Sequence, residues 1–131
     1  MIDTSFFSWL DSQTTWQIQE GKIDTEKDDP FIWFRRASTV QFHLLNGTAL
    51  DVFTTYFDVE VIGADIDAVQ TQADSLKTAL QSISPATVVG STFCKAITVE
   101  DHEDDYLSKV VLNTDDGLHL ASFSVKIIHR A

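Results

Sequence analysis

The sequence predicts a single α+β domain, residues 1–131, in which an antiparallel β-sheet with a long hairpin is covered on one face by helices. Two long segments rich in aromatic and β-branched residues flank an Asn46-Gly47 pair, which is typical of a hairpin. A later segment carries one apolar stripe at helical spacing, which predicts the main amphipathic helix. The last long segment alternates apolar and polar residues, as a half-buried strand does.

The first thirty residues predict a short N-terminal helix, a strand and a loop. A helix is expected over residues 2–10, because one stripe at helical spacing contains Ile2, Phe6, Trp9 and Leu10. Residues 16–20 alternate in polarity, which predicts a strand that ends at Gly21. The polar, acidic residues that follow, up to Pro30, predict a loop.

The hairpin is expected to pair residues 31–45 with residues 48–62. A two-residue type I′ turn at Asn46-Gly47 places Leu45 opposite Thr48. This register sets the pairs Ile32 with Val61, Phe34 with Val59 and Arg35 with Asp58. It puts apolar pairs on one face and an opposite-charge pair on the other, so both faces agree with it.

The length of the hairpin is itself informative. Strands of about 15 residues run roughly 50 Å, whereas a domain of this size has a radius of gyration of only ~14 Å. The distal half must therefore bend back onto its own core, through a bulge, or project. Its apolar side chains are costly to leave in water, so we favour an arm that packs against a neighbouring subunit. The expected interface residues are Arg36, Val40, Phe42, Leu44, Leu50, Val52 and Phe53.

The remaining elements are the main helix and two closing strands. Asp65 is expected to cap a helix that runs to about Ser84 and is stopped by Pro85. Its apolar face consists of Ile66, Val69, Ala73, Leu76, Ala79, Leu80 and Ile83. Strands are predicted over residues 93–100 and 118–129, the second with Ala121, Phe123, Val125 and Ile127 on one face.

The chain is strongly acidic. It carries 20 Asp plus Glu against 9 Lys plus Arg, a formal net charge of −11, and its pI is near 4.4. Such a surface disfavours binding to nucleic acid and to anionic membranes, although negative charge also serves solubility alone. Cys94 is the only cysteine, and the chain shows neither a basic leader nor an apolar run long enough to span a bilayer. We expect it to act in the cytoplasm, or in something assembled there.

The densest charge cluster, residues 100–105, is the one candidate for metal binding. Carboxylates and a histidine are possible ligands for a divalent cation, but the spacing of an EF-hand loop is absent. We favour a solvated acidic loop, lining a channel or a subunit surface, with Asp101, Glu103, Asp104 and Asp105. His119 and His129 lie ten residues apart in one predicted strand, about 33 Å, which is too far to share a metal.

No residues predict catalysis or a cofactor. Cys94 lies in a predicted strand without a neighbouring base, which is typical of a buried, inert thiol. Nucleotide-binding glycine loops and the nucleophile motif of hydrolases are absent from the sequence. We therefore expect no enzyme activity, no cofactor and no metal.

From Pro30 onward the order of features resembles the tail-completion, or tail-terminator, family of long-tailed bacteriophages, whose members are minor tail proteins. The resemblance covers about three-quarters of the chain, and patterns of a fold carry it rather than a chemical motif. It runs through the segments 30–36, 42–47 and 57–63, the amphipathic helix and residues 117–130. The short N-terminus and its acidic loop depart from the family pattern, so the first thirty residues match it poorly.

The resemblance implies a structural virion protein, assembled in the host cytoplasm, that forms a ring, usually a hexamer, on the head-proximal end of the tail tube. Such a ring ends tube polymerisation, meets the head-tail connector and lets DNA pass without specific binding. Its partners are further copies of the chain, the major tail-tube protein and connector proteins. The alternatives are a small ferredoxin-like binding domain or a connector (neck) protein, and a metal-dependent enzyme using residues 100–105.

Overall fold

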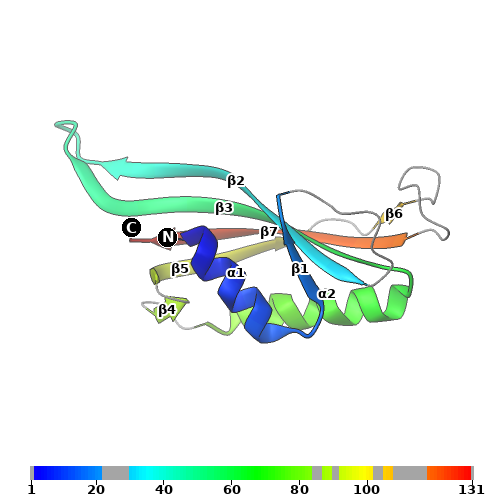
Figure 1. The fold of residues 1–131 in the computed structure, drawn as a ribbon. Coiled ribbons are helices and arrows are strands. Elements are labelled where there is room, and N and C mark those ends of the chain that lie inside the picture. The colour runs from blue at the N-terminus through cyan, green and yellow to red at the C-terminus, as the bar shows by residue number, and fades with distance from the viewer. Residues whose placement is uncertain are drawn as a thin grey trace.

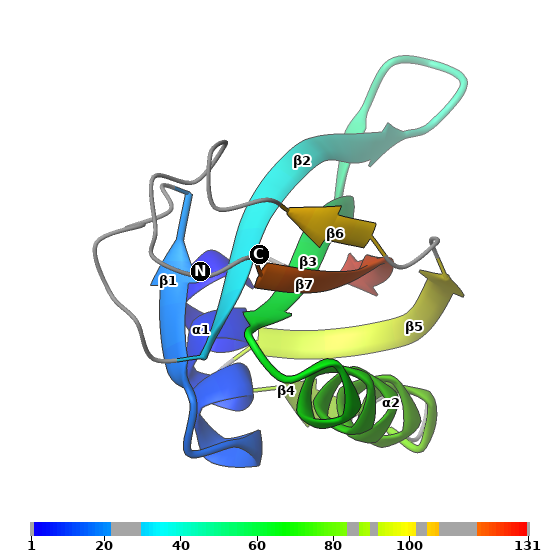
Figure 2. The same ribbon diagram turned by 90° about the vertical axis from the view of Figure 1, so that its right-hand side faces the viewer.

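The computed structural model describes residues 2–21, 30–83, 87–89, 92–101, 105–107 and 118–130. The sheet order is β1-β2-β3-β7-β5-β4, with β6 also paired to β7, and both helices lie on one face of the sheet (Figures 1 and 2). The α+β prediction is therefore confirmed. In chain order the elements are α1 (Ile2–Gln13), β1 (Gln17–Glu20), β2 (Phe31–His43), β3 (Ala49–Gly63), α2 (Ile66–Gln81), β4 (Thr87–Val89), β5 (Thr92–Asp101), β6 (Asp105–Leu107) and β7 (Leu118–His129).

The sheet is mixed rather than wholly antiparallel, which corrects the prediction. β1 pairs in parallel with β2, from Gln17 opposite Phe31 to Glu20 opposite Phe34. Alternating polarity reveals that a segment is a strand but not the direction in which it pairs, so the sequence could not distinguish the two arrangements.

The predicted hairpin register is confirmed at its base and wrong at its turn. Ile32 pairs with Val61, Phe34 with Val59 and Arg35 with Asp58. At the tip, Leu44 rather than Leu45 faces Thr48, because the backbone nitrogen of Leu44 donates to the Thr48 oxygen over 2.8 Å. The loop holds three residues, and Gly47 adopts φ +86°, the left-handed conformation that glycine favours.

Two irregularities in the pairing of β2 with β3 account for the change of register between the base of the hairpin and its tip. Arg36 faces Phe57 while Ser38 faces Tyr56, so Ala37 is an extra residue in β2. Gln41 faces Phe53 while His43 faces Ala49, so residues 50–52 lie against Phe42 alone, and β3 has two extra residues there. The first bulge exchanges the faces of β2 beyond it, because side chains alternate with a period of two.

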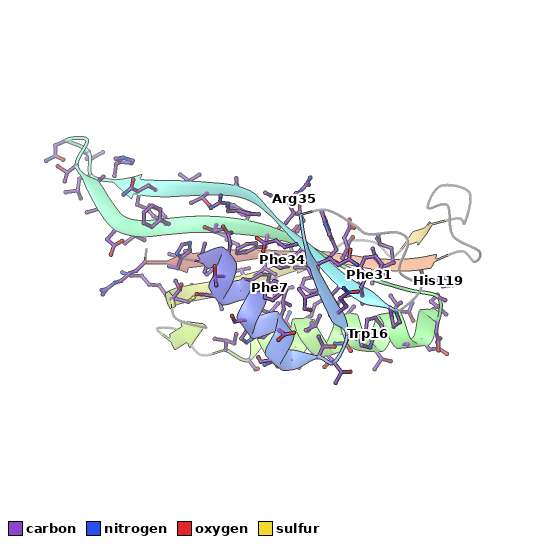
Figure 3. The ribbon with its side chains drawn as sticks, viewed as in Figure 1. Phe7, Trp16, Phe31, Phe34, Arg35 and His119 are labelled. Carbon is purple, nitrogen blue, oxygen red and sulfur yellow. The ribbon has the colours of Figure 1, made fainter. Side chains whose placement is uncertain are left out.

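The core lies between the sheet and the two helices. The Phe6 ring of α1 stacks on Phe57 with centroids 4.4 Å apart and meets Phe34 edge-on at 5.4 Å. Ser5 and Thr92 share a buried hydroxyl hydrogen bond of 2.7 Å, which fixes α1 to β5. Figure 3 shows Phe7 and Phe34 on this helix side of the sheet.

Helix α2 confirms its predicted cap and most of its stripe. The Asp65 carboxylate accepts a hydrogen bond from the Asp67 nitrogen over 3.0 Å. The buried positions are Val69, Ala73, Leu76 and Leu80. Ile66 was expected on this face, but 44% of it is exposed, because it lies in the first turn, at the end of the helix. Pro85 and Ser84 lie outside the described residues.

The last strand, β7, occupies the centre of the sheet. It pairs antiparallel with both β3 and β5, so β3 and β5 run in parallel around it, with α2 in the connection between them. Its helix-facing residues are buried as predicted: Ala121, Phe123, Val125 and Ile127. The predicted strand over residues 93–100 is confirmed as β5.

We expect Phe6→Ala to lower the free energy of unfolding by about 3–5 kcal/mol, because it empties the centre of the aromatic cluster. The matched change Phe42→Ala, on an exposed ring at 44%, is expected to cost less than about 0.5 kcal/mol. Urea unfolding followed by tryptophan fluorescence measures both. Equal losses in the two variants would contradict the assignment of α1 to the core.

Candidate assembly surface

The distal hairpin leaves the rest of the sheet and forms an arm, residues 40–52. β7 follows β3 outward only as far as the pair Phe53 and His129, and β1 follows β2 only as far as Phe34. Figure 1 shows the tip projecting beyond the other strands. The two strands of the arm are therefore paired with each other alone over most of their length.

The arm presents apolar side chains to water. The exposed fractions are 59% for Val40, 44% for Phe42, 49% for Leu44 and the full side chain for Leu45. Leu50, Val52 and Phe53 are partly covered. The bulges thus do not fold the tip onto the core of its own chain, and the interface role of these residues stays a prediction.

A side-chain hydrogen bond stabilises the second irregularity, between Gln41 and His43. Gln41 Nε2 donates to the main-chain oxygen of Leu50 over 3.0 Å, which supplies a partner to a backbone group in the extra β3 segment. A buried or half-buried carbonyl without a partner is costly. This hydrogen bond therefore favours the projecting shape over a regular ladder.

A polar network closes the root of the arm. His129 is buried, and its Nδ1 lies 2.6 Å from the Arg130 oxygen, which can only accept, so Nδ1 carries the proton. Nε2 then accepts from the Thr55 hydroxyl at 2.7 Å, and the Thr39 hydroxyl at 3.1 Å donates to Thr55. The Phe53 ring stacks on His129 at 5.8 Å. The network therefore links the C-terminal end of β7, at His129, to both strands of the hairpin, through Thr55 of β3 and Thr39 of β2.

Arg36 has an acidic partner within its own chain. Its Nη1 lies 3.4 Å from Asp3 Oδ2 of α1. The sequence predicts Arg36 as an interface residue and pairs only Arg35, with Asp58, so this contact with α1 was not foreseen. Since 44% of the side chain is exposed, a role at an interface stays a prediction, but the charge is already partly balanced.

The acidic cluster is only partly a loop. Asp101 ends β5 opposite Phe123, and Asp105 begins β6 opposite Leu120. Both strands lie on the same edge of β7, so these two residues belong to strands, and the prediction of a loop is wrong for them. Glu103 and Asp104, like the acidic residues 24–29, lie outside the described residues.

The sheet face away from the helices carries a polar row that sequence reasoning identified only in part. Arg35, Asp58, Ser124 and Glu100 are successive cross-strand neighbours, and Figure 3 shows Arg35 on this side. Asp58 accepts from Arg35 Nη2 and from Ser124 Oγ, each over 3.2 Å. The predicted Arg35–Asp58 pair is confirmed.

Glu60 and Trp33 line a cavity of about 170 Å³ beside this row. Burial raises the pKa of Glu60 above its usual value, the Asp58 carboxylate adds to the rise, and the Arg35 guanidinium opposes it. The Arg35 guanidinium also lies 5.5 Å from the centre of the Trp33 ring. Sequence reasoning missed these two residues, although the predicted register places them opposite each other, because the cavity also needs Ser122 and Phe123 of β7, whose place beside β3 was not predicted.

Within the described residues, no three His, Cys, Asp or Glu side chains lie close enough to hold a metal. Cys94 is buried, and its thiol donates to the Thr92 oxygen over 3.6 Å. His119 and His129 lie at opposite ends of β7.

Comparison with models of known protein families and with curated proteins finds no match for the chain. Over the residues described, neither helix is long and apolar enough to cross a membrane. The apolar arm and the polar sheet face are therefore the features that bear on function.

We expect Thr55→Val to destabilise the fold by about 1–3 kcal/mol, because it leaves His129 Nε2 buried without a donor. Thr55→Ser keeps the hydroxyl and serves as the control. Urea midpoints of the two variants give the comparison. A Thr55→Val protein as stable as the Thr55→Ser protein would show that the network contributes nothing.

We expect Glu60→Gln to stabilise the fold at pH 7. The raised pKa means that the folded chain prefers protonated Glu60, so this stabilisation is complete below the ordinary pKa of 4.5 and is lost as pH rises through the folded pKa. Glutamine removes the charged form, and its advantage should shrink as pH falls toward 4. Thermal melts of the variant and the wild type across pH 3.5–8 test this prediction. A difference in melting temperature that does not change with pH would contradict it.

Proposed function

We propose that the chain is a structural component of a phage tail, and that copies of it form a ring on the head-proximal end of the tail tube. The ring ends tube polymerisation and joins the tail to the head-tail connector. Its partners are other copies of the chain, the major tail-tube protein and connector proteins, and its place is the virion. No catalysis belongs to this function.

The observation that carries the proposal is the apolar arm. Four large apolar side chains on it are at least 44% exposed, and a buried apolar surface contributes about 25 cal/mol per Å². Clustered apolar exposure of this kind marks an interaction surface rather than chance. An arm that projects from a sheet is suited to reach a neighbouring molecule, which is what a ring subunit requires.

The acidity supports the same function. The polar row of the open sheet face includes Asp58 and Glu100, with Glu60 beside it, and the whole chain has a net charge of −11. Carboxylates repel phosphate groups, so DNA passes such a surface without being retained. Titration of DNA onto the assembled ring at low salt tests this point, and tight binding would contradict it.

The test of the ring function uses the major tail-tube protein whose gene we expect beside the gene of this chain. With the wild-type chain present, polymerising tubes should stop at a shorter, narrower length distribution in electron micrographs. Phe42→Asp places a charge on the arm and should abolish this effect. Thr78→Asp places the same charge on an exposed position of α2 and should leave it intact.

The proposal would be contradicted if the wild-type chain does not bind the tube, and if tube lengths are the same with the wild-type chain and with Phe42→Asp. Binding to connector proteins without any effect on the tube would identify the neck-protein alternative instead. The neighbouring genes provide an independent check, because portal, connector and major-tail genes are expected beside this one.

We also expect self-assembly to strengthen as salt rises. Copies that each carry −11 repel one another, and the Debye length shortens from about 30 Å at 0.01 M to about 8 Å at 0.15 M ionic strength. The apolar contacts of the arm are not weakened by this screening. Sedimentation velocity at the two ionic strengths measures the shift. Assembly that weakens with salt would indicate contacts dominated by ion pairs, such as Arg36 with acids of a neighbour.

A further inference from the structure

An apolar hollow lies where β3 passes into α2. It has a volume of about 170 Å³ and is lined by Trp16, Pro30, Gly63, Ala64, Asp65 and Ala68. A site for a drug-sized molecule has roughly 300–1,000 Å³. The hollow is therefore too small for such a ligand, but it has room for one or two aliphatic side chains.

The floor of the hollow depends on a glycine. A Cβ on Gly63 would lie 3.1 Å from Val69 Cγ2 and 3.3 Å from Pro30 Cβ. The absence of a side chain lets the end of β3, the first turn of α2 and Pro30 come together. Asp65, the polar residue of the lining, is already engaged as the cap of α2, so the free lining is mainly apolar.

Among the residues whose side-chain exposure the structure describes, large apolar side chains are exposed in two places. Four of them lie on the arm, and the fifth, Ile66, follows directly after the hollow-lining Asp65. Figure 1 shows the arm tip at one end of the molecule and the start of α2 toward the other, and Figure 3 labels Trp16 on the side of α2. A projecting apolar tip and an apolar hollow are thus present on the same chain, toward opposite ends of the molecule.

We propose that the arm tip of one copy, with Leu44 and Leu45, docks into the Trp16–Gly63–Ala68 hollow of the next copy, beside its Ile66. This inference rests on the proposed function and names the surface that receives the arm. Two different patches of one chain make a heterologous, head-to-tail contact, and such contacts close into rings when the rotation between copies permits.

The area available favours a second copy as the occupant. An arm about six residues long has faces of roughly 20 Å by 10 Å, so its two faces offer about 400 Å². A stable pairwise interface needs about 800 Å² on each partner. One arm is therefore too small to hold an isolated dimer. In a closed ring each copy donates one arm and receives another, so each copy is held by two such contacts, although each contact keeps the same area.

Cysteine crosslinking tests the contact. Leu45→Cys labels the tip, and Ala64→Cys labels the hollow at an exposed position. Oxidation of the two variants mixed together should give a disulfide-linked dimer, because a disulfide forms only when Cα atoms come within about 7 Å. Each variant alone should give no more dimer than wild type, whose Cys94 is buried. The double variant should give a ladder of linked species that ends at the ring.

Two outcomes would overturn the inference while leaving the ring function intact. Linked dimers of Leu45→Cys alone would show that arms meet tip to tip. Assembly of the mixture on tail tubes without any crosslink would show that the arm docks elsewhere. Ala64→Phe provides a second measurement, since it fills the hollow and should block assembly, whereas Thr78→Phe should not. A chain that stays monomeric in every case, even with the tail-tube protein, would overturn the ring function as well.

Discussion

The register of β3 is the constraint on which the rest of the molecule depends. From Phe53 to Ile62 this strand is paired on both sides, with β2 and with β7. A shift by one residue would move Phe57 and Val59 from the helix side to the open face and bring Asp58 into the core. The same register creates the polar row on the open face. Packing of the helices and the chemistry of the exposed sheet are therefore two consequences of one pairing.

The arm exists because of this register and because β3 is long. β3 is longer than the strands that flank it, so its first residues have only β2 as a partner. The bulge at Ala37 turns Val40 toward the face away from the helices, opposite Thr54, where neither α1 nor α2 can cover it. The chain therefore folds a complete core around Phe57 and leaves an apolar extension that its own helices cannot bury. This division between a complete core and an uncovered extension is the physical basis for our proposal that the chain assembles with other copies.

Strong local patterns predicted most of the fold. The stripe of α2, the alternation of β7 and the base of the hairpin depend on periodicity and opposite-charge pairing, which are present in the residues themselves. The parallel direction of β1 and the insertion of β7 between β3 and β5 depend on contacts between distant segments, which one sequence does not encode visibly. The turn was misplaced because Asn46-Gly47 suits both a two-residue and a three-residue loop. The apolar arm could be foreseen from strand length, but the hollow beside Ile66 could not, because Gly63, Trp16 and Pro30 meet only in the folded chain.

The central claim is that another copy of the chain covers the arm. Amide hydrogen exchange, followed as protein concentration and salt are raised, measures this cover directly. The account predicts that exchange slows in two separate segments, residues 40–52 and 63–68, and stays unchanged in α1 and the middle of α2. Exchange in the arm that is independent of concentration, under conditions where larger species form, would contradict it.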